Sequence, residues 1–275
     1  MGAGRPSHYR ESTSGDGVRQ CNLSPLSCLV RVNRAGTRRR GSIGAMVWYL
    51  SDLRENPQAF LVFFAATIVA ILTGLVFHEF THAWTANELG DDTARRRGRM
   101  TLNPLVHLDP VWTAAIFLFG FGMAKPTPVQ PYRLKYGPLR GNAVVAMAGP
   151  LSNFVFAGLA ALPIQLGLVE SRFATNVEAV IRFGTGQEYV FLFLYFVIWL
   201  NVLLGLFNLI PIPPLDGFKV VVGFLPAGIA RELIRLEPYG FGILMTMFVV
   251  GFFTGFNPIW FLIGGLADSL FNLLV

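Results

Sequence analysis

A long apolar segment that ends in polar and charged groups decides the class of this chain: residues 59–84 read AFLVFFAATIVAILTGLVFHEFTHAW. Eighteen consecutive residues of it, from Phe60 to Phe77, carry no charge. A helix of about 20 apolar residues spans the hydrocarbon core of a bilayer. The whole chain is 53% hydrophobic and only 14% charged, with a mean hydropathy of +0.53. These values are typical of a membrane protein with several spans and not of a soluble domain.

Further apolar stretches follow the first one. A short stretch, residues 111–124, has too few residues for a straightforward crossing and is expected to be re-entrant or interfacial. The stretches that we expect to cross are 142–169, 189–210 and 239–253, and a closing apolar stretch follows at 258–275. The sequence therefore predicts an all-α fold, a polytopic membrane protein with four to six transmembrane helices. Two weakly alternating segments, 98–103 and 127–131, are candidates for short strands at the membrane surface.

The formal net charge of +6 comes from the N-terminal tail. Residues 1–45 hold eight arginines against Glu11 and Asp16, whereas residues 46–275 hold equal numbers of basic and acidic residues. Residues 46–275 therefore carry no formal net charge, and no nucleic-acid partner is expected. We interpret residues 1–45 as a disordered basic tail, with Met46 as an alternative start. Residues 46–275 are then a single membrane-embedded domain.

The end of the first apolar segment contains an HExxH pattern, His78-Glu79-Phe80-Thr81-His82. On a helix, residues i and i+4 are neighbours, so both imidazoles face the same side. Two histidines with a nearby carboxylate are typical of a catalytic zinc site, in which the glutamate handles a proton. The pattern therefore predicts an intramembrane zinc site with His78 and His82 as metal ligands and Glu79 as the catalytic residue.

The distribution of arginine and lysine indicates the topology of the chain. Two basic stretches, residues 95–99 and 125–140, flank the short apolar segment 111–124. If that segment does not cross, both stretches lie on one face of the membrane, which the positive-inside rule makes cytoplasmic. The first span ends on this face with its two histidines, and the crossing 189–210 returns to it just before Asp216. Asp216 is therefore expected at the depth of the histidines.

A second motif, Asn208-Leu-Ile-Pro211-Ile-Pro-Pro214-Leu-Asp216-Gly217, follows that crossing. Its prolines prevent helix continuation, and irregular backbone at membrane depth is tolerated only inside protein or beside a watery cavity. Together with the HExxH pattern, this motif resembles the site-2 protease family of intramembrane zinc metalloproteases. The resemblance extends to Gly149-Pro150-Leu151-Ser152-Asn153 and covers roughly residues 46–225.

The resemblance implies a function for these residues. Asp216 would complete a His2Asp site for one zinc ion, and Asn208 and Asn153 would bind substrate or stabilise an oxyanion. The domain 46–275 would be a minimal zinc metalloprotease without a PDZ or CBS domain. Its substrate would be a membrane protein with a transmembrane helix, and a regulatory membrane partner could govern access. We expect a multi-pass protein of a bacterial-type cell membrane, with its active site toward the cytoplasm.

Several alternatives stay open at this point. Asp216 before an apolar stretch could be a helix N-cap instead of a ligand. His107, in the sequence NPLVHLDP, is a second metal-seeking group, although its spacing favours a structural role. The chain could also be a quality-control protease that cuts cytoplasmic loops, which would take a third ligand from a glutamate. A non-catalytic metal-binding membrane module is the remaining alternative.

Overall fold

The computed structural model of the protein describes residues 57–110, 124–170 and 186–275. All regular secondary structure in these ranges is helical, which confirms the all-α fold class. The first helices are α3 (Pro57–Ile71), the π-helical turn η2 (Leu72–Val76), α4 (Phe77–Glu88), α5 (Thr93–Arg96), α6 (Pro104–His107) and η3 (Pro131–Arg133). The later ones are α8 (Arg140–Gln165), α10 (Gln187–Asn208), α11 (Asp216–Phe224), α12 (Ala227–Ile234), α13 (Glu237–Thr254) and α14 (Pro258–Leu274).

Three helices are long and apolar enough to cross a membrane: Pro57–Glu88, Arg140–Gln165 and Gln187–Asn208. Helices α12 and α13 together form a fourth candidate, although they meet at a bend of 62°. Helix α14 is apolar but has only 17 residues. The described chain is thus a helical membrane protein with up to four such spans, which reaches the lower end of the expected four to six.

Some predictions concern residues that the structure does not describe. The tail 1–45, the start at Met46 and nearly all of the short apolar segment 111–124 lie outside the described residues.

The prediction of short strands at 98–103 and 127–131 is wrong, because neither segment forms a strand. Pro128 and Pro131 remove two of the five backbone donors that a strand at 127–131 would need. A third donor, the N–H of Gln130, is bound to a carboxylate oxygen of Asp91. These backbone groups are therefore not available for pairing with a second strand.

The first span is a continuous helix of 32 residues with a π-helical turn in its middle. Gly74, in that turn, allows close approach of two neighbouring helices. A Cβ at this position would lie 3.0 Å from the side-chain oxygen of Asn201 in α10 and 3.1 Å from the amide nitrogen of Asn153 in α8. The span ends where Gly90 adopts a positive φ of 98°, a conformation that glycine takes without steric cost.

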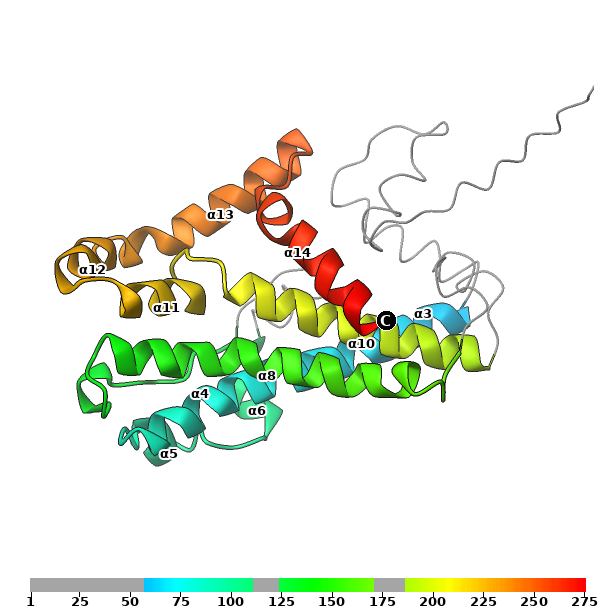
Figure 1. Ribbon diagram of the computed structural model, residues 1–275, viewed down its shortest axis with the longest axis horizontal. Helices are drawn as coiled ribbons and strands as arrows, with labels where there is room; N and C mark the ends of the chain where they lie inside the picture. The colour runs from blue at the N-terminus through cyan, green and yellow to red at the C-terminus, as the bar shows by residue number, and fades with distance from the viewer. Residues whose placement is uncertain (1–56, 111–123, 171–185) are drawn as a thin grey trace, which may run out of the picture.

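Helices α8 and α10 form the frame of the molecule. They run side by side along its long axis, with α4 and α11 against α8, and α3 and α14 against α10 (Figure 1). Small residues such as Ala157 permit close contact between α8 and α10. Close van der Waals packing of this kind is a main source of helix association in lipid, where the hydrophobic effect between helices is absent.

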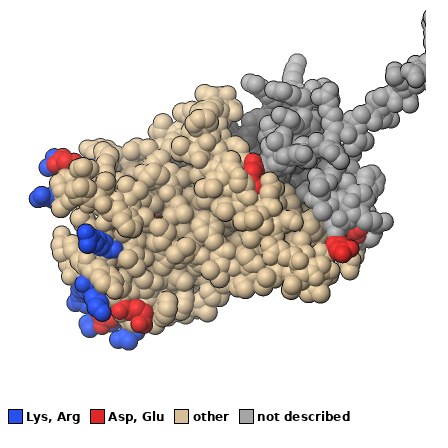
Figure 2. Space-filling view, viewed as in Figure 1, with Lys and Arg blue, Asp and Glu red and all other residues tan. Residues whose placement is uncertain are grey.

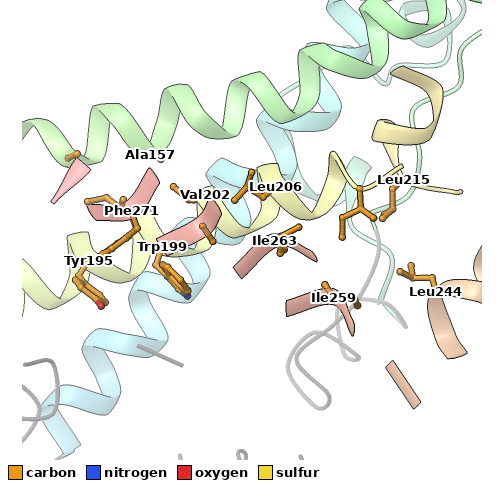
Figure 3. Packing of buried hydrophobic residues seen from close by; sticks show 14 of the residues in the cluster. Ala157, Tyr195, Trp199, Val202, Leu206, Leu215, Leu244, Ile259, Ile263 and Phe271 are labelled. Atoms are coloured by element: carbon orange, nitrogen blue, oxygen red, sulfur yellow. The ribbon is translucent and has the colours of Figure 1, made fainter. Parts of the chain in front are cut away.

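The largest apolar cluster lies between α8, α10 and α14 (Figure 3). Phe271 of α14 makes edge-to-face contacts with Tyr195 and Trp199 of α10, at centroid distances of 4.6 and 5.2 Å. Such aromatic pairs each contribute about 0.5–1.5 kcal/mol beyond their buried area. The cluster continues to Leu206 and Leu215, on either side of the proline-rich break after α10. This packing fixes the end of α10 from which the chain turns into α11.

Candidate metal centre

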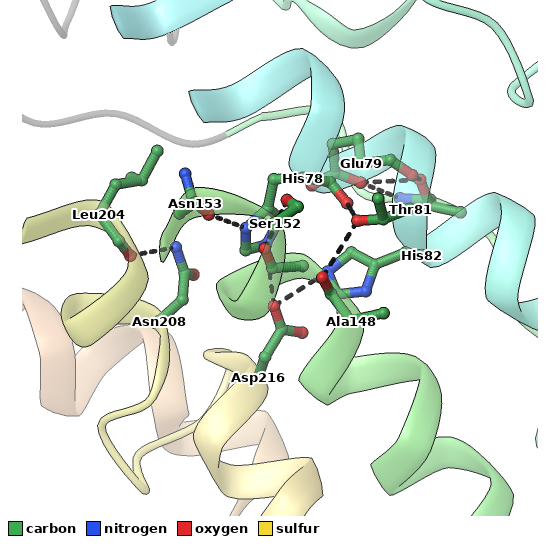
Figure 4. A network of polar contacts seen from close by, with 12 residues as sticks. His78, Glu79, Thr81, His82, Ala148, Ser152, Asn153, Leu204, Asn208 and Asp216 are labelled. Atoms are coloured by element: carbon green, nitrogen blue, oxygen red, sulfur yellow. Dashed lines mark hydrogen bonds and ion pairs between the residues drawn. The ribbon is translucent and has the colours of Figure 1, made fainter. Parts of the chain in front are cut away.

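Three buried side chains from two separate helices converge on one point. His78 and His82 belong to α4 and Asp216 is the first residue of α11. The Oδ2 atom of Asp216 lies 3.0 Å from the Nε2 atom of each histidine, as Figure 4 shows. The three residues are only 5–7% exposed. Their ligand atoms all lie within 4.8 Å of one another, so they could hold one metal ion.

The helical spacing explains how the two rings reach the same point. His78 and His82 are one turn apart on α4. Their ring centroids are 4.6 Å apart, and the two ring planes meet at an angle of 89°. The two Nε2 atoms therefore point to the same side of the helix, as the HExxH spacing predicts.

The other nitrogen of each ring is fixed by a hydrogen bond. His82 Nδ1 lies 2.7 Å from the backbone carbonyl of Val145, which can only accept. His78 Nδ1 lies 2.8 Å from Oδ1 of Asn153, whose amide nitrogen donates in turn to the carbonyl of Gly74 at 2.9 Å. This network assigns the proton to Nδ1 in both rings. Each Nε2 of a neutral ring then presents a lone pair toward Asp216.

Where both rings are neutral, this arrangement brings three acceptors together. Two imidazole lone pairs and a carboxylate oxygen at 3.0 Å repel one another unless a cation lies between them or the rings are protonated. Two histidine nitrogens and one carboxylate oxygen are a common ligand set for catalytic zinc, with a fourth position left for water. The donor set therefore fits a zinc ion, and the fixed Nδ1 atoms are the outer contacts that orient histidine ligands.

The second oxygen of Asp216 has a partner of its own. Lys219, three residues further along α11, places its Nζ atom 3.1 Å from Oδ1. The lysine is partly exposed, with 40% of its side chain accessible. This contact leaves Oδ2 as the oxygen that faces the histidines.

Helix α8 closes one side of the cluster through a glycine. A Cβ on Gly149 would lie 2.5 Å from His82 Nε2 and 2.6 Å from His78 Nε2. No side chain fits there, so the backbone of α8 lies directly against the two ligand atoms. The space at the Nε2 atoms is thus kept by the absence of a side chain at position 149.

A sequence model of Peptidase family M50 matches residues 66–249, which is more than half of the chain. The chain belongs to peptidase family M50. This match includes His78, His82 and Asp216 as well as the glycine beside them.

Three relatives of this M50 peptidase are each named as a putative zinc metalloprotease. YwhC from Bacillus subtilis (strain 168) is 36% identical over 208 residues, which cover 75% of this chain and 89% of the relative. Rip2 from Mycolicibacterium smegmatis is 31% identical over 232 residues, or 82% of this chain and 80% of the relative. Rip2 from Mycobacterium tuberculosis (strain H37Rv) is 26% identical over 234 residues, or 84% and 82%. No solved structure shows a significant match.

These comparisons confirm the resemblance to the site-2 protease family, and none of the matches brings in a PDZ or CBS domain. The chain is accordingly a zinc metalloprotease of a membrane-embedded family. The cluster of His78, His82 and Asp216 could hold its one metal ion.

The structure gives Glu79 of this M50 peptidase a partner outside its own helix. Glu79 lies between the two histidines in sequence and is 8% exposed. Its Oε2 atom accepts hydrogen bonds from the backbone N–H and the hydroxyl of Thr127, at 2.9 and 2.7 Å. Neither Thr127 nor Lys219 was found from the sequence. The i+3 spacing of Lys219 from Asp216 was a usable signal, whereas nothing in the sequence links Thr127 to Glu79.

The two asparagines of the prediction lie in different surroundings. Asn153 is fully buried, and its side chain bonds to His78 and to the carbonyl of Gly74. Asn208 is partly buried at the end of α10, and its amide nitrogen donates to the carbonyl of Leu204 in the same helix at 2.9 Å. Figure 4 shows both side chains on the same side of the cluster. The carbonyl oxygen of Asn208 makes no contact with the three ligands.

His107 does not join the cluster. It is fully buried at the end of α6, where its Nε2 atom lies 2.7 Å from the carbonyl of Thr101. The only described group of three metal-binding side chains is that of His78, His82 and Asp216. The position of His107 therefore agrees with the structural role that its spacing favours.

Proposed function

We propose that this membrane zinc metalloprotease is an intramembrane endopeptidase, which hydrolyses peptide bonds in or near the transmembrane segments of other membrane proteins. In this proposal His78, His82 and Asp216 hold the zinc ion, and Glu79 is the general base. The observation that carries the proposal is the convergence of the three ligand atoms, all within 4.8 Å of one another, between helices of the bundle.

The depth of the cluster supports cleavage at the membrane. The uncharged run from Phe60 to Phe77 ends directly before His78 within one continuous helix. The two histidines thus follow the part of this helix, α3 and η2, that is long enough to lie in the hydrocarbon core. Ionisable groups at this depth are costly unless they bind one another or an ion, and this supports a functional site.

The chemistry of the proposal assigns a task to each group. A zinc ion at this site would polarise the scissile carbonyl and lower the pKa of a water molecule. Glu79 removes a proton from the attacking water and delivers it to the leaving amine. In this proposal Asn208 binds the backbone of the substrate, whereas Asn153 orients His78. The substrate helix must unwind locally, because an intact helix uses its carbonyls for internal hydrogen bonds.

The position of Glu188 argues against this glutamate as the third ligand. Glu188 lies in the first turn of α10, at the opposite end of that helix from Asn208. Twenty residues at about 1.5 Å per residue separate the two ends by roughly 30 Å. Asp216 instead contacts both histidines, which supports the intramembrane type over the quality-control type.

The charges of the described residues support a site toward the cytoplasm. Lysine and arginine side chains gather at one end of the molecule (Figure 2), over the segments that follow α4 and precede α8 and over α12. Acidic side chains lie among them, whereas in this view the other end of the described part shows acidic side chains without lysine or arginine. The positive-inside rule favours the basic end as the cytoplasmic one, and the first span runs through α4 toward this end (Figure 1). The protein would then be a multi-pass protein of a bacterial-type membrane.

Replacement of the base tests the proposal. Glu79→Gln in the purified full-length protein should keep one zinc per chain and lose cleavage of a fluorescent transmembrane peptide, since it spares the ligands and removes the base. Glu88→Gln changes an exposed glutamate of the same helix and should leave cleavage unchanged. Undiminished cleavage by Glu79→Gln would refute the assigned role. Wild-type protein that binds zinc but cleaves no membrane peptide would refute the function.

A further inference from the structure

The carboxylate of Glu79 is held by a residue that lies 48 positions away in the chain. Two donors of Thr127, its backbone N–H at 2.9 Å and its hydroxyl at 2.7 Å, converge on Oε2 of Glu79. The hydroxyl also lies 3.1 Å from the backbone carbonyl of Glu79. A hydroxyl has one proton to donate, and an ionised acceptor forms the stronger bond. The carboxylate is therefore the preferred acceptor, and neither donor takes up Oε1.

Thr127 lies in the loop segment 124–135, which is fixed to the rest of the protein at several points. Backbone N–H groups of this segment donate to the carbonyls of His107 and Leu89, at 2.9 and 2.8 Å. Another donates to the carboxylate of Asp91 at 2.6 Å. Asp91 is completely buried, so this last bond is shielded from water. The segment is thus attached both before and after Thr127.

The residues around Thr127 restrict its backbone further. Pro126 and Pro128 flank it; proline fixes its own φ and limits the conformation of the residue before it. Leu134, only 4% exposed, packs in a small apolar cluster with residues of α4 and α8, including Ala86. The Thr127 donors are therefore presented from a rigid support and not from a free loop.

We propose that Thr127 is a positioning residue for catalysis, whose hydroxyl fixes the Glu79 carboxylate so that Oε1 faces the attacking water. The inference rests on the proposed role of Glu79 as the general base. A glutamate side chain has several rotatable bonds and loses rotamer freedom when it is ordered. If Oε2 is anchored before the substrate arrives, the entropy cost of ordering the Glu79 side chain is not added to the barrier of the catalytic step. The base is also held in a productive geometry.

The test compares Thr127→Val with Thr127→Ser in the full-length protein. Valine keeps the branched shape and the backbone N–H but removes the hydroxyl, whereas serine keeps the hydroxyl. We expect Thr127→Val to lower kcat roughly 10- to 100-fold, the scale of a misplaced catalytic group, with KM and zinc content unchanged. Thr127→Ser should recover most of kcat. Thr246→Val removes a hydroxyl that bonds within α13, to the carbonyl of Gly242, and should leave kcat unchanged.

The outcomes separate this inference from the proposed function. Wild-type kcat in Thr127→Val, or equal losses in the valine and serine variants, would overturn the positioning role alone. Undiminished cleavage by Glu79→Gln would overturn the role of Glu79 and this inference with it. If Thr127→Val loses zinc or does not fold, the comparison of kcat is made between Thr127→Ala and Thr127→Ser. We then expect a lower kcat in Thr127→Ala than in Thr127→Ser. Equal kcat values in these two variants would also overturn the inference.

Discussion

The Nε2 atom of His78 lies 3.0 Å from the Oδ2 atom of Asp216, although 138 residues separate the two along the chain. The contact joins α4, the last part of the first long helix, to the first residue of α11. Helix α8 packs against both of these helices. The relative position of the two ligands therefore depends on the helix bundle and not on any local turn.

Replacement of Asp216 should remove the metal. We expect Asp216→Ala to lower zinc affinity by more than about 100-fold, because loss of a direct ligand should exceed the 10- to 100-fold effect of an outer contact, and to abolish peptide cleavage. Asp216→Asn should retain weak binding, since its amide oxygen can coordinate but brings no charge. Zinc stoichiometry of the purified variants, measured by mass spectrometry, checks both.

His107 serves as the control for that assignment. Its imidazole is buried and bonds to the carbonyl of Thr101, so His107→Ala should lower thermal stability but leave one zinc per folded chain. If zinc survives Asp216→Ala and is lost in His107→Ala, the third ligand has been assigned to the wrong residue.

Gly149 should tolerate no side chain. In Gly149→Ala the new methyl carbon would lie 2.5–2.6 Å from both histidine Nε2 atoms, so zinc affinity and cleavage should both fall sharply. Gly158→Ala is the matched control, because it lies on the same helix and its Cβ would meet nothing within 4 Å. Equal zinc content in the two variants would contradict the close contact between α8 and the histidines.

The two asparagines should affect different steps. Asn153→Ala removes the acceptor of His78 Nδ1 and should lower zinc affinity about 10- to 100-fold, as loss of an outer contact to a ligand does. Asn208→Ala should leave zinc content unchanged, since the Asn208 amide donates to Leu204 within α10 and, among the described residues, to no metal ligand. If Asn208 binds substrate, its replacement should lower kcat/KM. A loss of zinc in Asn208→Ala would assign it to the metal site instead.

The topology can be tested by cysteine labelling in a variant that lacks Cys21 and Cys28. Cysteines placed near Arg97 and Lys135 should react from the cytoplasmic side, and cysteines within 170–188 from the opposite side. Reaction of the first two positions from opposite sides would mean that the segment between them crosses the membrane. The orientation proposed for the site would then be wrong.

Much of the fold could be predicted from patterns of apolar residues. The crossing expected at 142–169 is helix Arg140–Gln165, and the one expected at 189–210 is helix Gln187–Asn208. A long uncharged run specifies a helix in lipid, because only internal hydrogen bonds satisfy its backbone there. The strand predicted at 127–131 failed because pairing requires a neighbouring strand, which local alternation cannot supply.

The sequence by itself determined the groups whose relationship is local. The two histidines share a face because residues four apart on a helix are neighbours. The three prolines that follow Asn208 within six residues disfavour further helix, because each lacks a backbone N–H and its ring crowds the preceding turn. Motif resemblance added Asp216 and the membrane protease family, which the comparisons confirm as peptidase family M50.

Only the tertiary structure decided the contacts between separate elements. Asn153 orients His78 because α8 packs against both the π-helical turn η2 and α4, and the same packing places Gly149 against both Nε2 atoms. Thr127 reaches Glu79 because buried Asp91 and neighbouring backbone bonds fix its loop. Helical periodicity specifies which face a residue occupies. Which residue of another element meets that face depends on side-chain packing across the whole bundle.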